Sequence, residues 1–226
     1  MKKDYVSVIY DTTTRPVTQY PDQLASHLAN RFGMKPGQQL LDVGFGRGDF
    51  LRAFARVGLK VSGVDQSPSA LESCADLDVH SCCAGRDQLP FPDESFDIVF
   101  HKSLLEHLDD PEPLMEETLR VLRPGGRLIV LVPDWISQMG IYFDDHTHRR
   151  PYTQVGLKDL LVICGFQDVH AELFHQLPVL WKHPSLKIVS RLLRGVVRPE
   201  HRPKSSFVRW SVELMILGAG VKPTRA

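Results

Sequence analysis

Short apolar runs alternate along the chain with stretches whose apolar residues recur at helical spacing. A buried strand is typically a short continuous apolar run, whereas an amphipathic helix repeats its apolar residues every three or four positions. The runs predict strands over 39–43, 61–65, 79–82, 96–100, 127–132 and 166–174, and another within 211–222. The periodic stretches predict helices over 21–32, 50–57, 109–121 and 155–164, and a short helix that begins at Ser67-Pro68. Strands that alternate with helices in this way indicate an α/β domain built on a mostly parallel sheet.

Three glycines at alternate positions follow the first predicted strand, in the stretch LLDVGFGRGDF. A glycine-rich turn between a strand and a helix lets the backbone take positive φ and approach a ligand closely. It also points backbone N–H groups and a helix N-terminus at that ligand. The spacing G-x-G-x-G differs from the G-x-G-x-x-G of a dinucleotide-binding turn. The turn therefore predicts a bound ligand, and the alternative is a glycine-rich turn that binds nothing.

Two carboxylates near this turn indicate the chemistry of the ligand. Asp42 lies two residues before Gly44, where it repels a pyrophosphate but suits a cationic group such as the ammonium of an amino acid. Asp65 ends the next strand, about 20 residues further on, where folds of this type carry a ribose-binding acid. The turn and the two acids together favour a nucleoside that carries an amino-acid tail.

On these residues the chain resembles the class I S-adenosylmethionine-dependent methyltransferases, in their small-molecule, methyltransferase type 11-like branch. The likeness runs without a gap from Leu40 to Pro133 and includes the wording LPFPDESFDIVF and LLEHLDDPEPLMEETLRVLRPGGRLIVLVP. It implies a three-layer Rossmann-like fold with a mostly parallel seven-stranded sheet whose last strand is antiparallel. It also implies methyl transfer from S-adenosyl-L-methionine to a small-molecule, sugar or lipid-linked acceptor.

The resemblance further implies which residues hold the cofactor. The three glycines of the turn approach it, Asp42 lies near its amino-acid tail and Asp65 holds the ribose hydroxyls. One position departs from the family, because Gly85 stands where an Asp usually meets the adenine; Asp87 nearby or a backbone group is expected to replace it. The predicted cofactor-binding residues are Asp42, Gly44, Phe45, Gly46, Gly48, Asp65, Gln66, Gly85, Arg86, His101 and Lys102.

Candidate catalytic residues gather in the segment 134–152, which begins just past a strand end and hence on the ligand side of the sheet. Histidine is the usual side chain for proton transfer near neutral pH. We therefore predict that Asp144, His146 and His148 are catalytic, in proton transfer or acceptor binding.

Two alternatives for this loop stay open. In the first, His148 and Tyr152 only fasten the loop to the next helix. In the second, the Asp and His side chains of the loop converge on a metal ion, although no metal is assigned to the site. Upstream, Glu106-His107 falls in a predicted helical segment. There we interpret His107 as a residue that holds the loop above it, in preference to a general base.

Residues 176–206 separate the last two predicted strands, where the family needs only a short connection. Within them, Ser185 to Arg198 predicts an amphipathic helix with one basic stripe opposite a broad apolar side. We expect this insertion to form a hydrophobic lid beside the acceptor site, which implies an acceptor with an apolar part. The alternative is that the helix lies on an anionic membrane surface.

Composition changes this picture in a few respects. A length of 226 residues suits a single methyltransferase domain over 1–226, with 1–20 as an N-terminal arm. A formal net charge of zero argues against a nucleic-acid partner, although methylation of RNA or protein stays an alternative. The four cysteines match neither a zinc site nor a disulfide framework, and no apolar run approaches the ~20 residues of a membrane span. The expected localisation is cytoplasmic, with membrane-surface contact left open; the oligomeric state stays undetermined.

Two functions from other classes compete with methyl transfer. The first is a nicotinamide-dependent oxidoreductase, against which the missing G-x-G-x-x-G spacing counts. The second is a non-catalytic module that binds S-adenosylmethionine and transfers nothing, which the departure at Gly85 keeps open. Cofactor titration separates the first from methyl transfer, and turnover separates the second.

Overall fold

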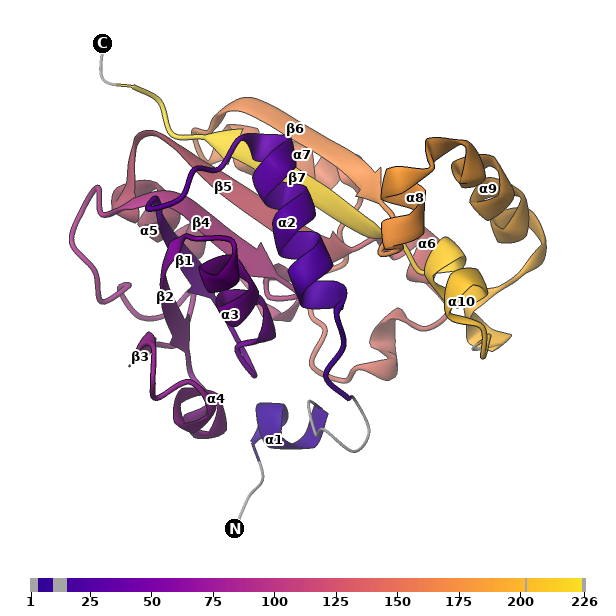
Figure 1. The fold of residues 1–226 in the computed structure, drawn as a ribbon, viewed down its shortest axis with the longest axis horizontal. Coiled ribbons are helices and arrows are strands. Elements are labelled where there is room, and N and C mark those ends of the chain that lie inside the picture. Colours follow the sequence, from indigo (N-terminus) through magenta and orange to yellow (C-terminus); the bar gives the residue numbers. More distant parts are fainter. Residues whose placement is uncertain (1–3, 10–15, 202, 225–226) are drawn as a thin grey trace.

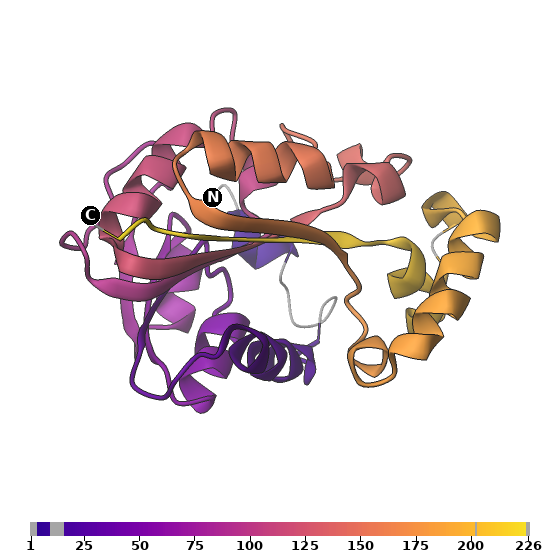
Figure 2. The same cartoon turned by 90° about the horizontal axis from the view of Figure 1, so that it is seen from above.

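The computed structural model describes residues 4–9, 16–201 and 203–224. Seven strands form one sheet of order β3-β2-β1-β4-β5-β7-β6, with helices on both faces (Figure 1 and Figure 2). The strands are β1 (Gln39–Val43), β2 (Lys60–Asp65), β3 (Asp78–Ser81), β4 (Phe96–Lys102), β5 (Leu122–Pro133), β6 (Gln167–Phe174) and β7 (Met215–Val221). β7 pairs antiparallel with β5 and β6, whereas β1 to β5 pair parallel. The predicted three-layer fold is confirmed, including its antiparallel last strand.

Alternation along the central strands builds the two hydrophobic layers. In β5, Leu128 and Val130 pack on the side of α5 (Glu112–Val121) and α7 (Gln154–Ile163). Ile129 and Leu131, the residues between and after them, pack on the side of α2 (Tyr20–Phe32) and α3 (Asp49–Arg56). Successive side chains of a strand point to opposite faces, so a strand buried on both faces is apolar throughout. This is why the predicted strands are continuous apolar runs.

Local signals set several helix boundaries where the sequence predicts them. Ser67 caps α4 (Pro68–Ser73), with its hydroxyl accepting the N–H of Ala70 at 3.4 Å. Thr153 caps α7 in the same way, accepting the N–H of Gly156 at 3.1 Å. A cap residue of this kind satisfies one of the backbone N–H groups that the first turn leaves without a partner.

One predicted element differs from the structure. Glu106-His107 lies in a single 3-10 turn, η1 (Leu105–His107), rather than in the body of a helix. The strand predicted within 211–222 is confirmed as β7, which starts at Met215, after α10 (Ser206–Val212). In the N-terminal arm predicted over 1–20, α1 (Tyr5–Ile9) is helical, and residues 1–3 and 10–15 lie outside the described residues.

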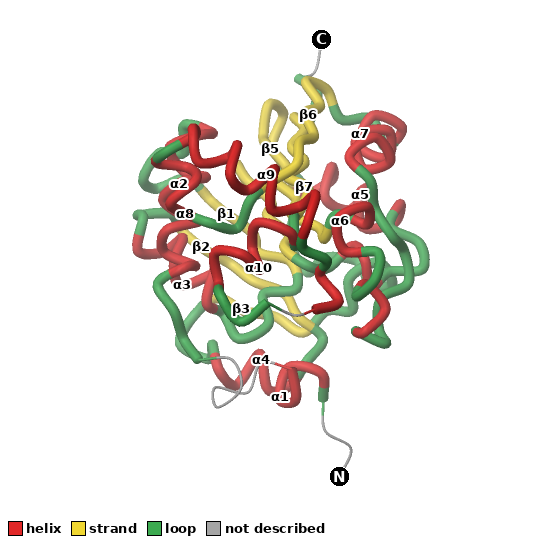
Figure 3. The backbone as a smooth tube through the Cα atoms, turned by 90° about the vertical axis from the view of Figure 1, so that its right-hand side faces the viewer, coloured by secondary structure: helices red, strands yellow, loops and turns green. Residues whose placement is uncertain are grey.

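The insertion before β7 is helical, as predicted, but does not form the expected lid. It consists of α8 (Pro178–Lys182), η3 (Pro184–Leu186), α9 (Lys187–Val196) and η4 (Pro199–His201), followed by α10. Figure 3 shows α9 and α10 at the near side of the molecule, and Figure 1 shows them beyond the start of β7. Ser190 is buried and its hydroxyl donates to the carbonyl oxygen of Ser211. α9 therefore packs on α10 through its Ser190 side.

The apolar side of α9 faces solvent instead of the domain. Ile188, Leu192 and Val196 are 67%, 68% and 85% exposed. The contact with α10 covers only one narrow side of the helix, so the apolar side stays exposed. The prediction that this side packs over the acceptor site is therefore wrong. The argument that the acceptor has an apolar part loses its support with it. No helix in the described part of the chain is long and apolar enough to cross a membrane.

Candidate functional site

A cavity of about 720 Å³ lies at the carboxyl end of the parallel strands. Its wall begins at the glycine turn after β1 and continues past the end of β2 to the segments after β3 and β4. The loop before α7 closes the far side through Thr147 and Arg149. Of the predicted cofactor residues, the cavity wall contains Gly44, Gly46, Asp65, Gln66, Gly85 and Arg86.

Asp65 is held in the cavity wall by two backbone N–H groups. Its Oδ2 accepts the N–H of Gly46 at 2.8 Å, and its Oδ1 accepts the N–H of Ser67 at 2.8 Å. Burial raises the pKa of the carboxyl, while these two donors act in the opposite direction. The hydrogen bonds tie the glycine turn of β1 to the end of β2, so the acid and the turn form one rigid wall. Such a carboxylate is positioned to accept hydrogen bonds from vicinal hydroxyls of a ligand.

The three glycines of the turn have different neighbours. All three have positive φ, at 75° for Gly44, 56° for Gly46 and 80° for Gly48. A Cβ on Gly46 would have no atom within 4 Å, whereas a Cβ on Gly48 would lie 2.1 Å from the Sγ of Cys74. Gly46 therefore faces the open cavity, and Gly48 permits the close packing of α3 against the residue after α4.

The adenine end of the predicted site contains Gly85 and Arg86 but not Asp87. The Oδ2 of Asp87 accepts the N–H of Cys83 at 2.8 Å, so this carboxylate holds the turn to which it belongs. A replacement of the missing family Asp by Asp87 therefore finds no support in the cavity wall. A backbone group at 85–86, the other expectation, stays a prediction.

Five predicted cofactor residues do not line the cavity. They are Asp42, Phe45, Gly48, His101 and Lys102. His101 is fully buried, and burial lowers its pKa to about 3, so the imidazole is neutral. The Nζ of Lys102 lies 5.3 Å from the centre of the Phe50 ring. Because alternate side chains of a strand point to opposite faces, a strand end at the cavity brings only some of its neighbours to the wall.

Asp42 lies beneath the turn and is 2% exposed. Burial, with a further contribution from Asp65, raises its pKa from 3.8 to about 8, against the opposing effect of Lys102. At a pH between these two pKa values, Asp42 keeps its proton in the folded state but has lost it in the unfolded state. Stability contributed by this group is therefore lost as pH rises from about 4 to about 8.

Asp42→Asn is expected to remove this pH dependence, because the amide cannot ionise. The variant should match the parent protein near pH 5 and exceed its stability at pH 8.5 by about 1 kcal/mol or more, or roughly 2–4 °C in Tm for a chain of this size. Thermal unfolding at the two pH values measures the difference. The exposed Asp159→Asn is the matched control. A gain for Asp42→Asn that is the same at both pH values would contradict the expectation.

The loop before α7 presents other residues to the cavity than those predicted. Thr147 and Arg149 line it, whereas Asp144, His146 and His148 do not. The hydroxyl of Thr147 donates to the Oδ1 of Asp145 at 2.6 Å, and the Thr147 N–H reaches the same oxygen at 3.0 Å. This turn fixes Thr147 toward the cavity and leaves His146 exposed. Nothing in the residue pattern distinguishes the inward positions of the loop from the outward ones.

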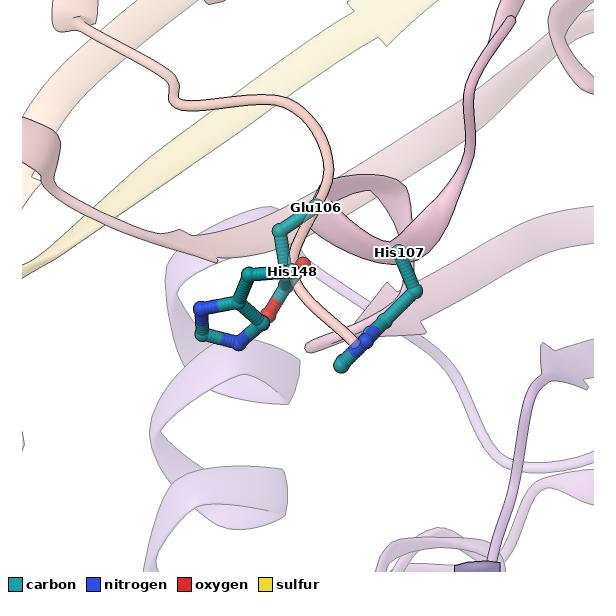
Figure 4. Close-up of side chains that lie close together, drawn as sticks. All are labelled: Glu106, His107 and His148. Carbon is teal, nitrogen blue, oxygen red and sulfur yellow. The ribbon is translucent and has the colours of Figure 1, made fainter. Parts of the chain in front are cut away.

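His107 lines the cavity, and its Nδ1 lies 2.9 Å from the hydroxyl of Thr147, in agreement with its interpretation as a residue that holds the loop. Figure 4 shows its side chain beside those of His148 and Glu106, and one donor atom from each residue lies within 4.8 Å of the others. Glu106 is 1% exposed, and neither carboxylate oxygen has a hydrogen-bond partner among the described residues. Burial raises the pKa of Glu106 to about 8 and, together with His148, lowers that of His107. The signal in the sequence is the stretch LEHL at 105–108, which follows β4.

The N-terminal arm contributes to the cavity as well. Asp4 and Val6 belong to its wall. The carboxylate of Asp4 accepts hydrogen bonds from the hydroxyls of Ser67 at 2.7 Å and Ser69 at 3.0 Å. These bonds fix the start of α1 over the N-terminus of α4, beside the carboxylate of Asp65.

The sequence is similar to known methyltransferases over about half of its length. The profile of a family described as "Methyltransferase domain" matches residues 41–130. A methyltransferase of Mycobacterium sp. strain KMS without an assigned function is 35% identical over 114 residues, which cover 50% of this chain and 45% of that protein. A ubiquinone/menaquinone biosynthesis C-methyltransferase of Vibrio vulnificus is 39% identical over 110 residues, 44% of this chain and 42% of that protein. The chain thus spans less than half the length of these relatives.

Solved structures extend the similarity of the fold to the rest of the chain. A Haloferax volcanii methyltransferase, in complex with the Trm112 activator, has a TM-score of 0.72 at 19% identity and covers 99% of both chains. Phosphoethanolamine N-methyltransferase 2 of Haemonchus contortus, bound to S-adenosyl-L-methionine, has a TM-score of 0.65 at 22% identity over 89% of this chain and 52% of that one. The sheet order and the glycine turn agree with the family match: residues 41–130 form a methyltransferase domain of that family, and the sheet has the order of the Rossmann-like methyltransferase fold.

Proposed function

We propose that this protein transfers a methyl group from S-adenosyl-L-methionine to a small-molecule acceptor in the cavity at the carboxyl end of the sheet. The observation that carries the proposal is the Asp65 carboxylate, which is fixed by the N–H groups of Gly46 and Ser67 in the cavity wall. In this position it would accept hydrogen bonds from the ribose hydroxyls of the cofactor. Gly46 would lie against the amino-acid tail, and the backbone of 85–86 would flank the adenine.

The other end of the cavity would hold the acceptor. Ser103, His107, Thr147 and Arg149 provide hydroxyl, imidazole and guanidinium groups there. The sulfonium methyl is already activated, so the protein has to align the acceptor with the S–CH3 bond and exclude water. The relatives named for quinones and for phosphoethanolamine support a small molecule in preference to a nucleic acid or a protein.

Incubation with a methyl-labelled donor and a metabolite extract tests the proposal. Labelled product is expected with the parent protein and is expected to be lost in Asp65→Ala. Tight cofactor binding without any labelled product would support the non-catalytic binding module. Binding of a nicotinamide cofactor in place of S-adenosyl-L-methionine would support an oxidoreductase.

The membrane surface is the second partner that we propose, and it would bind through α9. Ile188, Leu192 and Val196 are four residues apart, share one side of the helix and are exposed. Lys187 and Arg191 lie on the adjoining side, also exposed. An exposed apolar side with basic residues beside it suits the interface of an anionic bilayer, where chains and headgroups meet. The proposal of membrane binding rests on this match between the surface of α9 and the bilayer interface.

Reversal of charge on α9 is expected to abolish vesicle binding. Near an anionic surface each basic residue contributes about 1 kcal/mol, so Lys187→Glu with Arg191→Glu should lower the partition coefficient more than tenfold. Co-sedimentation with phosphatidylglycerol vesicles measures it, and binding should also fall as salt rises. Lys60→Glu with Lys158→Glu makes the same change in net charge at exposed positions elsewhere and should leave binding unchanged. Equal binding by both double variants would contradict a role for α9.

A further inference from the structure

We propose that Glu106, His107 and His148 bind a divalent transition-metal ion of the zinc type at the wall of the cavity. The three side chains come from η1 and from the loop before α7, and Figure 4 shows them close together. Two imidazoles and one carboxylate are a ligand set that zinc, cobalt and iron accept, whereas magnesium and calcium prefer oxygen donors alone.

The spacing of the donor atoms is close to what such an ion requires. One donor atom from each residue lies within 4.8 Å of the other two. Around a tetrahedral zinc, with bonds of about 2.0–2.1 Å, neighbouring ligand atoms are about 3.3–3.4 Å apart. Small side-chain rotations would close this difference. Their ring centres are 4.9 Å apart.

Hydrogen bonds on the far side of each imidazole set the tautomer that a metal needs. The Nδ1 of His148 lies 2.6 Å from the carbonyl oxygen of Tyr142, which can only accept, so Nδ1 carries the proton. The hydroxyl of Thr147 donates to Asp145 and therefore accepts from the Nδ1 of His107, at 2.9 Å. In both rings Nε2 is then the nitrogen with the lone pair. Metal-binding histidines almost always donate their other N–H in this way.

Glu106 is the independent observation that points to a ligand. Its side chain is buried, and both oxygens lack a hydrogen-bond partner among the described residues. A buried polar group left without a partner destabilises the folded state, and more so when it is charged. The two bonds from the N–H groups of Arg149 and Arg150 go to the backbone oxygen of Glu106 and leave the carboxylate unsatisfied. An ion between Glu106 and the histidines would satisfy it.

The position of the cluster indicates what the ion would do. His107 and Thr147 belong to the cavity wall, so the ion would lie next to the end where the acceptor is proposed to bind. There it would coordinate an acceptor oxygen and lower the pKa of a hydroxyl, which makes methylation of that oxygen easier. This role rests on the proposed function, whereas binding of the ion does not.

Titration of the full-length protein with Co²⁺ and Zn²⁺ tests the site without reference to activity. We expect one ion per chain with a Kd in the micromolar range or tighter, seen as visible d–d absorption for Co²⁺ and as heat for Zn²⁺. Glu106→Gln and His148→Gln should each weaken binding at least tenfold, as loss of one of three protein ligands requires. His146→Gln removes an exposed histidine from the same loop and should leave the affinity unchanged. Circular dichroism checks that each variant is folded.

Three outcomes would overturn the proposal. They are the absence of saturable binding, an affinity that Glu106→Gln and His148→Gln do not change, and thiolate charge-transfer bands that disappear in Cys83→Ser. The first would make Glu106 a buried carboxylic acid, in which case Glu106→Gln should leave the Tm unchanged. Titration with S-adenosyl-L-methionine, run on the same samples, tests the proposed function separately, so failure of one is distinguished from failure of the other.

Discussion

Asp65→Ala is expected to weaken binding of S-adenosyl-L-methionine at least tenfold while the domain stays folded. The carboxylate would accept hydrogen bonds from the ribose hydroxyls, and hydrogen bonds to a charged group contribute about 1.5–3 kcal/mol. A loss of about 1.4 kcal/mol already corresponds to a tenfold change in Kd. The change also frees the N–H groups of Gly46 and Ser67, which loosens the turn where the cofactor tail would lie. Calorimetry on the purified variant measures the Kd.

Two further variants separate the ribose contact from a general effect on folding. Asp65→Asn keeps one acceptor oxygen and is expected to bind with intermediate affinity. Asp76→Ala removes an exposed carboxylate that pairs with Arg52, in the same part of the chain, and should leave the Kd unchanged. Unchanged affinity in a folded Asp65→Ala protein would remove the central assignment of the cofactor site.

The cofactor half of the cavity is the part that local sequence predicts well. The glycine turn and Asp65 lie at ends of neighbouring strands, and parallel pairing of β1 with β2 brings such ends together. What the pattern does not provide is which side each strand-end residue faces. Asp42 and His101 are expected at the cavity by position along the chain, and both are instead buried and do not contribute to its wall.

The acceptor half depends on contacts between distant segments. Arg149 reaches the cavity because its N–H, like that of Arg150, donates to the backbone oxygen of Glu106, some forty positions earlier. This contact also sets His148 against His107. The sequence shows that histidines and acids are present in both segments but carries no signal for their register. The predicted metal alternative therefore named the wrong partners, since the converging set joins the loop to η1.

The insertion shows a different limit of prediction from the sequence. The periodicity of 185–198 predicts α9 correctly, but an amphipathic pattern only states that an apolar side exists. Whether that side meets the domain, a membrane or another surface depends on how α9 packs on α10, through Ser190 and Ser211. A polar residue at the buried contact cannot be recognised from the pattern.

The largest expected effect on stability is that of Gly48→Ala. The added Cβ would lie 2.1 Å from the Sγ of Cys74, at a φ of +80° that alanine rarely adopts. Cys74 is fully buried in a cluster with Leu51 and Ala70, so its side chain has little room to turn away. Strain from overpacking of this kind costs about 1–3 kcal/mol, and the φ adds about 1 kcal/mol. We expect a loss of about 2–4 kcal/mol in the free energy of unfolding, measured by urea denaturation.

Gly37→Ala isolates the contribution of the contact from that of the backbone. Gly37 has a φ of +85°, and a Cβ there would have no atom within 4 Å, so only the cost of about 1 kcal/mol for the left-handed conformation is expected. Cys74→Ala tests the contact from its other side: once Sγ is gone, the nearest atom to the Gly48 Cβ that remains is the Cβ of residue 74, at 3.8 Å. Gly48→Ala should therefore cost less in the Cys74→Ala background than in the parent protein, by about 1 kcal/mol or more, as a double-mutant cycle measures. Equal costs for Gly48→Ala and Gly37→Ala, with no coupling to Cys74, would show that the glycine is needed for its backbone conformation alone.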